Sequence, residues 1–325
     1  MSRNNHDIVK LHGMRKSVTF FPQNHMVQTP SFESAMLHED LIHRVFPTGY
    51  RSSRTTELSI NIEPFSDEIY DCLSNAFFIH EPDKDLDSAV RSFVEHSIHM
   101  ILYQSEVFFE LVFDNISQSK AFLITPLPLG EVRIDNGTVV QFIPPQVQEA
   151  RGLHHPFVEI PEMNILHFSF PESLGGMAGI GRLISDFESF GGSLLPKFAE
   201  DDYERTMQEF GNALLKEYHN TREMAIATSS SSLGWACRNL WNNKITEYYS
   251  VYRQLKFARS AALIREHILL CLNEFISKRA LPRFGLEGNI TITGVPDSND
   301  LNTKLKELSE GTLSFKDALD YVYGF

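Results

Sequence analysis

The strongest constraint on the fold is a stretch of 36 residues, 244–279, that contains neither proline nor glycine. Its composition favours a single helix, which at 1.5 Å per residue would be roughly 50 Å long. The apolar residues occupy one face first and then another about half a turn round. The first face holds Tyr248, Val251, Tyr252 and Leu255, and the second holds Phe257, Ala261, Ile264, Ile268, Leu272 and Phe275. We therefore expect a helix that runs between two layers and bends near Leu255.

The composition is that of a globular protein. The sequence is 42% hydrophobic and 22% charged, and it has no run of 18 apolar residues. The N-terminal residues lack the apolar core of a signal peptide. Cys72, Cys237 and Cys271 are widely separated, as expected of small buried hydrophobic residues rather than a disulfide or zinc framework. These features predict a protein of the reducing cytosol with no membrane segment.

The net charge of -13 is unevenly distributed. Residues 57–202 carry 7 Lys and Arg against 24 Asp and Glu, whereas residues 203–280 carry 11 against 7. Two interpretations stay open for this basic helical segment. It is either a solvated helix face or a surface that meets a polyanion while the acidic remainder avoids it.

The N-terminal half of the chain predicts an α+β fold. Residues 1–57 are polar and without periodicity, so we expect a mobile arm. Alternation and β-branched residues then predict an antiparallel meander, with a hairpin turn at Asp135-Asn136-Gly137 and two helices packed over the sheet. The strands are expected at 58–62, 106–114, 121–125, 131–134, 138–143 and 164–170, the helices at 69–77 and 85–101, and a loop at 144–156.

The C-terminal half is mainly helical. A glycine run at 175–181 favours a tight turn over a phosphate-binding loop, because the dinucleotide spacing is absent. It leads into a short helix that Gly191-Gly192 is expected to interrupt. Further helices are expected at 201–227, 301–310 and 314–323, the last opened by a capping box of Ser314 and Asp317, and a strand at 289–293.

Catalytic signatures are absent from the sequence. There is no Walker loop, no G-x-S-x-G elbow and no C-x-x-C, and the spacing from His38 to His43 is one residue too long for H-E-x-x-H. We therefore predict no enzyme activity, no catalytic residues, no metal and no cofactor. A metal-assisted hydrolase stays as a distant alternative, because ligand-type side chains gather near one strand end: His154, His155, Glu159, Glu162 and His167.

The order of several short motifs is more informative than any one of them. A stretch PLPLGEVRI at 126–134 is followed by the pattern P-x-x-x-I-L-H-F at 161–168 and a glycine-rich turn at 179–183. A long helix ending in REHILLCLN at 265–273 then precedes a strand, a helix, Gly-Thr-Leu-Ser at 311–314 and a last helix. From residue 58 onward, this order resembles the portal, or head-to-tail connector, proteins of tailed bacteriophages, prophages and gene transfer agents.

The resemblance implies a ring at the capsid vertex, usually of twelve subunits, through which double-stranded DNA is packaged and ejected. The implied partners are the same chain, the DNA passing through without sequence preference, the major capsid protein, the terminase motor and a tail or neck adaptor. The implied location is the virion, and the host cytoplasm during assembly. A ring of this kind needs two different complementary faces on each subunit.

The resemblance also divides the chain into five parts. These are a mobile arm (1–57), an α/β wing with an antiparallel β-rich sheet (58–176), stem helices with a reduced clip and a tunnel loop (177–243), the long kinked wing helix and a strand (244–296), and C-terminal helices forming a reduced crown (297–325). Family members generally carry a larger clip between two stem helices, for which the 67 residues 177–243 leave little room.

The resemblance and local charge together select the candidate residues. Those expected at the DNA channel or its tunnel loop are Lys216, Arg222, Ser229, Ser230, Ser231, Arg238 and Lys244. Those expected to pack subunits together are Tyr248, Tyr252, Leu255, Phe257, Ile264 and Ile268. Trp235 and Trp241 beside Arg238 either stack on bases or fill a helix junction. The alternative function is a protein-interaction module, related to portals or not, that does not translocate DNA.

Overall fold

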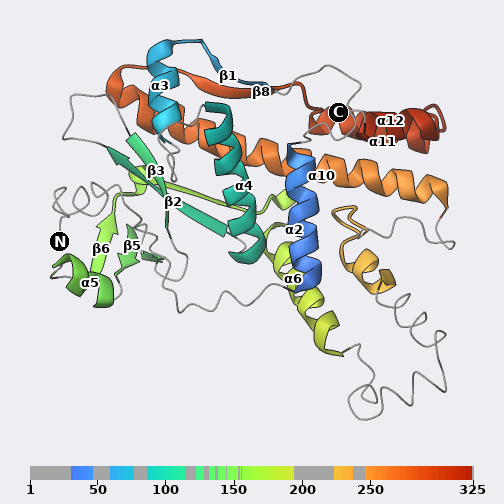
Figure 1. Cartoon of the computed structure of the whole chain (residues 1–325), viewed down its shortest axis with the longest axis horizontal. Helices are drawn as coiled ribbons and strands as arrows, with labels where there is room; N and C mark the ends of the chain where they lie inside the picture. The colour runs from blue at the N-terminus through green and yellow to red at the C-terminus, as the bar shows by residue number, and fades with distance from the viewer. Residues whose placement is uncertain are drawn as a thin grey trace. The chain divides into compact units, whose positions relative to one another are not determined.

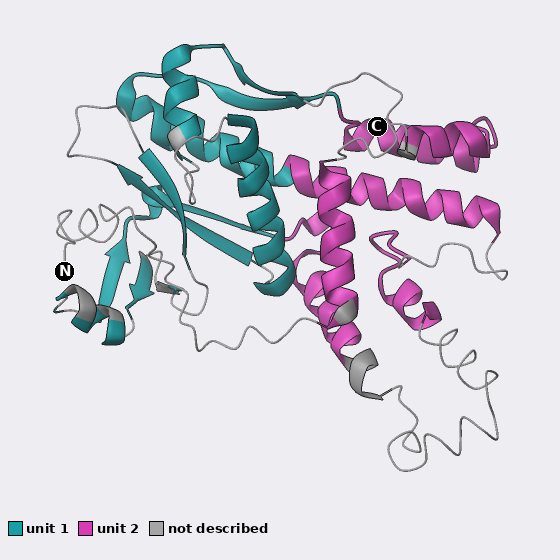
Figure 2. Ribbon diagram, in the orientation of Figure 1, with its two compact units in different colours: residues 1–26, 57–169, 267–294 teal, residues 27–56, 170–266, 295–325 magenta. Residues whose placement is uncertain are grey.

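The computed structural model describes residues 31–46, 59–76, 86–104, 106–113, 122–127, 132–135, 138–143, 145–152, 154, 156–193, 223–236 and 246–323. Helices and antiparallel sheets are both present, which confirms the α+β class. The chain divides into two compact units, coloured in Figure 2. Unit 1 comprises residues 1–26, 57–169 and 267–294, and unit 2 comprises residues 27–56, 170–266 and 295–325. The units interleave along the chain, whereas the five parts expected from the sequence are consecutive.

The centre of unit 1 is a three-stranded antiparallel sheet. Its middle strand β2 (Glu106–Phe113) pairs with β3 (Phe122–Leu127) on one side and β7 (Ile165–Ser169) on the other. Residues 107–112 of β2 are all buried. On one face α4 (Leu86–Gln104) packs against β2, with the Phe93 and Phe109 rings 4.7 Å apart, and α3 (Asp67–Ala76) packs on β3 (Figure 1). The two expected helices therefore do cover the sheet.

A second sheet covers part of the other face. β4 (Val132–Asp135) and β5 (Thr138–Phe142) form the predicted hairpin, and β6 (Phe157–Ile160) pairs with β5. A shared apolar cluster joins the two sheets through Phe108, Leu127, Val139, Ile160 and Ile165. The expected single meander is therefore wrong, because the hairpin leaves the first sheet and β7 returns to it. The expected loop also contains a helix, α5 (Pro145–Arg151).

A two-stranded ribbon completes unit 1. Its strands β1 (Ser59–Glu63) and β8 (Asn289–Thr293) were both expected, and they pair antiparallel although the sequence places them at opposite ends of the unit. Asn273 supports β8 from outside. Its amide donates to the Ile290 carbonyl and accepts from the Ile290 N–H, each at 2.8 Å, as a neighbouring strand would.

Unit 2 contains a helix where the sequence suggested part of a mobile arm. α2 (Phe32–Val45) begins at Ser31, whose hydroxyl accepts from the Ser34 N–H, and it buries Leu37, Leu41 and Val45. These three residues recur every four positions, so they share one face of the helix. The expectation of an arm is therefore wrong for residues 32–45, where this short apolar period outweighs the polar composition.

The helix after the glycine turn is longer than expected. A short 3₁₀ helix (Glu172–Leu174) ends at Gly175, which has φ +105°, and α6 (Gly176–Ser193) follows. α6 continues through Gly191 and Gly192, so the expected interruption is absent. Glycine costs a helix only about 1 kcal/mol relative to alanine, which neighbouring turns can offset. α6 packs against α2.

The long helix predicted at 244–279 is present as α10 (Glu247–Phe275), one uninterrupted α-helix (Figure 1). It passes through Leu255 without a break, so the bend expected there is absent. The departure from α-geometry comes later, in a π-helical turn (Ile276–Ala280) followed by a 3₁₀ turn (Leu281–Phe284). Residues 247–266 of α10 belong to unit 2 and residues 267–275 to unit 1.

The C-terminal helices close unit 2. α11 (Ser298–Ser309) and α12 (Phe315–Tyr323) pack on the first part of α10 through an apolar cluster. The predicted cap of α12 is confirmed, because Ser314 Oγ accepts from the Asp317 N–H at 3.1 Å and donates to its carboxylate at 2.6 Å. The cluster consists of Val251, Leu255, Ala262, Leu301, Leu308 and Ala318. Among the described helices, none is long and apolar enough to cross a membrane.

Candidate nucleic-acid interface

The structure describes only part of the predicted channel set. Lys216, Arg222, Arg238 and Lys244, with Trp241, lie outside the described residues. Ser229 is the last residue of a helical segment at 223–229, and Ser230 and Ser231 lie in the turn that follows. Ser229 is half-buried, Ser230 is fully buried and Ser231 is exposed. A fully buried Ser230 has no surface to offer to DNA, so its assignment to the channel is wrong.

Ser230 and Trp235 hold the two ends of this turn together. The Ser230 hydroxyl lies 2.7 Å from the Ile226 carbonyl and 2.6 Å from the Trp235 carbonyl, and it donates to one of them at a time. The Trp235 indole is buried, donates to Asp40 of α2 at 2.8 Å, and has its ring 5.6 Å from Phe187 of α6. Trp235 therefore fills a helix junction, as one of the two interpretations held, and it is not available to stack on bases.

Arg253 of α10 fixes the same turn from the other side. Its side chain is only 4% exposed, and it donates to the carbonyls of Ala227 at 3.0 Å, of Gly234 at 3.3 Å, and of Trp235. Ala227 lies in the last turn of the helical segment 223–229, where carbonyl oxygens have no partner in the helix. The cation thus caps the negative end of that helix. Burial lowers the pKa of the Arg253 guanidinium, and nearby Tyr249 partly offsets this.

Gly234 lets α10 approach the turn closely. It has φ +83°, and a Cβ atom there would lie 2.7 Å from the Phe257 nitrogen and 2.8 Å from the Arg253 carbonyl oxygen. Backbone atoms cannot give way as a flexible side chain can. We expect Gly234→Ala to lower the free energy of unfolding by about 2 kcal/mol, from strain and overpacking together.

Urea unfolding followed by circular dichroism measures this effect. Gly311→Ala is the matched control, because Gly311 also has a positive φ of +73° but has open space around its Cβ position. The close approach at Gly234 would be contradicted if the two variants lost the same free energy.

Arg265 repeats the arrangement at another helix end. Its guanidinium is buried and donates to the carbonyl of Val45, the last residue of α2, at 3.0 Å and to that of Pro296 at 2.7 Å. The adjacent Glu266 accepts from the N–H and hydroxyl of Ser298 at the start of α11. In unit 1, Arg279 donates to the carbonyls of Glu162 and Ile165, both at 2.9 Å.

These contacts change the meaning of the positive balance in residues 203–280. Arg253, Arg265 and Arg279 bind backbone carbonyls, and Lys278 pairs with Glu274 at 3.1 Å. In the described part of this segment, Lys256 and Arg259 are the cations left without a hydrogen bond or ion pair. A count of charges in the sequence cannot separate the cations that bind backbone carbonyls from Lys256 and Arg259.

Lys256 and Arg259 lie on one face of α10 with three tyrosines. Residues 248, 252, 256 and 259 follow one another at intervals of three or four, and Tyr249 stands three residues before Tyr252, which brings all five onto one side of a helix. Tyr248 and Tyr249 are 37% and 43% exposed, and the other three are half-buried. We call these five residues the tyrosine–basic stripe. The sequence analysis assigned Tyr248 and Tyr252 to subunit packing and did not select Lys256 or Arg259. Their helical spacing already places these two cations on the same face as the tyrosines.

The remaining residues predicted to pack subunits are in the interior of the chain. Leu255, Phe257, Ile264 and Ile268 are at most 6% exposed. Their apolar surface is already buried by the rest of the chain, so their assignment to a subunit interface is wrong. The second apolar face of α10 is explained by burial within the chain itself.

No metal centre is found among the described residues. His167 instead pairs with Glu106 at 2.9 Å on the neighbouring strand and stacks on Phe108 with ring centroids 4.2 Å apart. His154 is exposed, and His155 lies outside the described residues. The described part of the predicted cluster therefore gives no support to a metal hydrolase.

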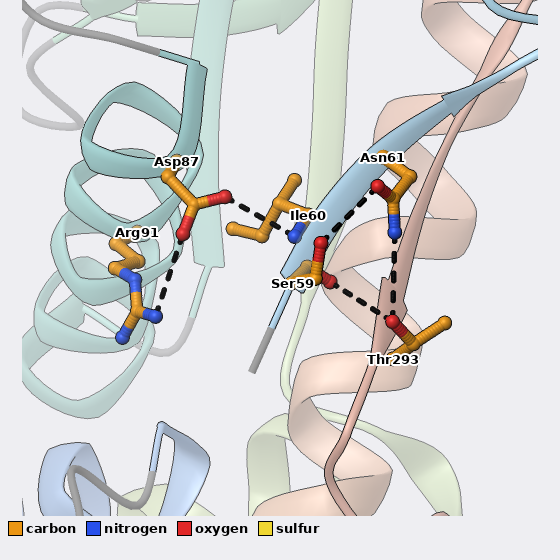
Figure 3. A network of polar contacts seen from close by, with 6 residues as sticks. All are labelled: Ser59, Ile60, Asn61, Asp87, Arg91 and Thr293. Atoms are coloured by element: carbon orange, nitrogen blue, oxygen red, sulfur yellow. Dashed lines mark hydrogen bonds and ion pairs between the residues drawn. The ribbon is translucent and has the colours of Figure 1, made fainter. Parts of the chain in front are cut away.

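A polar network covers one face of the β1–β8 ribbon (Figure 3). The Ser59 hydroxyl donates to Asn61 at 3.1 Å, and Asn61 and Thr293 lie 3.5 Å apart across the strands. On the outer edge of β1, the Ile60 N–H donates to Asp87 of α4 at 3.1 Å, and Asp87 also pairs with Arg91 at 3.6 Å. This network fastens the ribbon to α4 and satisfies one backbone N–H on the outer edge of β1.

Comparison with known proteins adds no further assignment. No protein-family model matches the chain, and no curated protein sequence matches it.

Proposed function

We propose that this protein is a portal-type subunit, a structural and non-enzymatic component of a ring through which double-stranded DNA is packaged into a phage capsid and later ejected. The observation that carries the proposal is the order of motifs and elements along the chain. β7, the turn at Gly175, α6, the turn at 230–236 that Arg253, Ser230 and Trp235 anchor, α10, β8 and the pair α11 and α12 follow one another in the order that the portal resemblance implies.

The anchored turn supports the proposal physically. A loop beside moving DNA must keep its position while the duplex slides, and here Arg253, Ser230 and Trp235 fasten its first part to α10, α6 and α2. The overall acidic charge limits non-specific attraction to phosphate. The proposed partners are other copies of the chain, the capsid protein, the terminase motor and a tail adaptor, in the virion.

Negative-stain electron microscopy of the purified full-length protein tests the proposal. We expect closed rings, with twelve subunits as the first expectation, because two complementary faces on each subunit close a ring. Light scattering gives the mass of the same sample. A protein that stays monomeric at high concentration, with no rings in the images, would overturn the proposal.

A second candidate is a protein-interaction module without DNA translocation. The observation that favours it is an exposed aromatic pair, Phe142 on β5 and Phe157 on β6, which face each other across the strands and are 47% and 46% exposed. Exposed paired phenylalanines are typical of contact surfaces. A monomer that loses a partner on Phe142→Ser with Phe157→Ser, but not on Lys256→Gln with Arg259→Gln, would favour this function.

A further inference from the structure

The tyrosine–basic stripe of α10 has an electrostatic character unlike the rest of the protein. Lys256 and Arg259 are three residues apart, and buried Arg253 adds a third cation on the adjacent side of the same helix. Neither Lys256 nor Arg259 pairs with a carboxylate in the described part of the chain. In a protein of net charge -13, an uncompensated group of cations is a local exception.

The cations repel one another at this position. Burial, followed by the charges of Arg253 and Arg259, lowers the pKa of Lys256 below its ordinary value. An anion bound beside Lys256 and the outer part of Arg259 would offset this repulsion, so the surface is complementary to negative charge.

The tyrosines indicate which part of a nucleic acid would be bound. The rings of Tyr248 and Tyr252 stack on each other with centroids 6.3 Å apart, Phe315 covers Tyr248 at 6.0 Å, and the Arg253 guanidinium lies over Tyr249. Because their faces are engaged within the chain, these rings are poorly placed to stack on unpaired bases. Their hydroxyls can still donate to phosphate oxygens, as tyrosines do at DNA backbones.

We propose that the tyrosine–basic stripe binds the phosphate backbone of double-stranded DNA, without reading its base sequence. The choice of duplex DNA as the ligand rests on the proposed function. The stripe assigns the DNA contact to the start of the long helix, and its two cations were not among the channel residues expected from the sequence. Two cations for each subunit give weak contacts that can be exchanged as a duplex slides.

Fluorescence anisotropy of a labelled duplex tests the stripe, with the full-length protein at 50 mM salt and then at higher salt. Two duplexes of different sequence should bind equally well. Lys256→Gln with Arg259→Gln should weaken binding on the order of tenfold and flatten the salt dependence by about 0.9 in log–log slope for each phosphate that is no longer neutralised. Lys256→Gln alone should give about half of each effect.

The matched control is Lys278→Gln with Lys306→Gln. These lysines are exposed and paired with Glu274 and Glu310, so the control removes the same two charges away from the stripe. It should leave affinity and slope nearly unchanged. If the double stripe variant fails to fold, Lys256→Gln alone decides the test, because Lys256 is only half-buried.

The outcomes separate this inference from the proposed function. No binding of duplex by the unaltered protein, or equal binding by the stripe and control variants, overturns the inference, even where rings are seen. If the protein forms no rings but the stripe variant still loses duplex binding, the proposed function is overturned. The inference that the stripe binds phosphate then stands. A preference for single-stranded DNA would contradict the argument from the engaged tyrosine rings.

Discussion

Arg253→Met is expected to lower the free energy of unfolding by about 3 to 5 kcal/mol. Methionine fills a similar length but cannot donate a hydrogen bond, so the carbonyls of Ala227, Gly234 and Trp235 would lose their partner in the interior. The end of the helical segment 223–229 would also lose the cation at its negative pole. Urea unfolding with circular dichroism at neutral pH gives the value directly.

Two further variants make this result specific. Arg253→Lys keeps the charge but has a single ammonium in place of the branched guanidinium, so it should recover only part of the loss. Lys278→Met removes a cation from an exposed pair in the π-helical turn after α10 and should cost less than about 0.5 kcal/mol. A loss below about 1 kcal/mol for Arg253→Met would show that the three carbonyls are satisfied without the guanidinium.

Local patterns predicted much of the secondary structure. β2, the hairpin of β4 and β5, α10 and the capped helix α12 all lie close to their expected positions. In each case the signal is contiguous in the sequence. It is alternation with β-branched side chains, an Asp-Asn-Gly turn, a capping box, or a stretch without glycine or proline. Such signals depend on backbone sterics and on one buried face, which a sequence states directly.

The arrangement of those elements depends on pairs that the sequence separates widely. β1 pairs with β8, and β7 returns to β2 after a second sheet has formed. Several pairings would bury the same strands equally well, so periodicity cannot choose among them. The apparent change of buried face on α10 is a similar case. A helix with neighbours on several sides buries apolar residues all round, and no bend is required.

The charged residues show most clearly that a count of charges does not reveal what each cation binds. Arg253 and Arg265 look like any basic residues of a helix, yet each binds the carbonyl end of another helix that is distant in sequence. What separates them from Lys256 and Arg259 is the neighbour, which only the fold supplies. The positive balance of the helical segment thus combines structural cations with two half-buried cations, Lys256 and Arg259, that bind no backbone carbonyl in the described part of the chain.

Acidification is expected to destabilise the protein through one half-buried histidine, His96 on α4, whose Nε2 atom is closed to solvent. Burial, with a smaller contribution from His99, lowers the pKa of His96 to about 4, and its Nε2 atom makes no hydrogen bond in the described part of the chain. Its ring centroid lies 6.2 Å from that of Phe109. The folded protein therefore keeps this imidazole neutral at a pH where an unfolded chain would protonate it.

The sign and size follow from proton linkage. Between pH 6.5 and about 4 the unfolded state binds a proton that the folded state does not, so stability falls as the pH falls through this window. At 1.36 kcal/mol per pKa unit the loss is about 3 kcal/mol, complete near pH 4. His96→Leu should unfold in urea with a correspondingly smaller loss between pH 7 and pH 4.5 than the unaltered protein.

Because protonation of carboxylates also contributes in acid, the difference between variants isolates the histidine. His154→Gln is the matched control, since it removes an exposed histidine of unit 1 and should leave the pH dependence unchanged. An equal acid-induced loss in His96→Leu and the unaltered protein would mean that the α4 imidazole is hydrated or paired in solution. The pH dependence of unfolding would then have to come from the carboxylates alone.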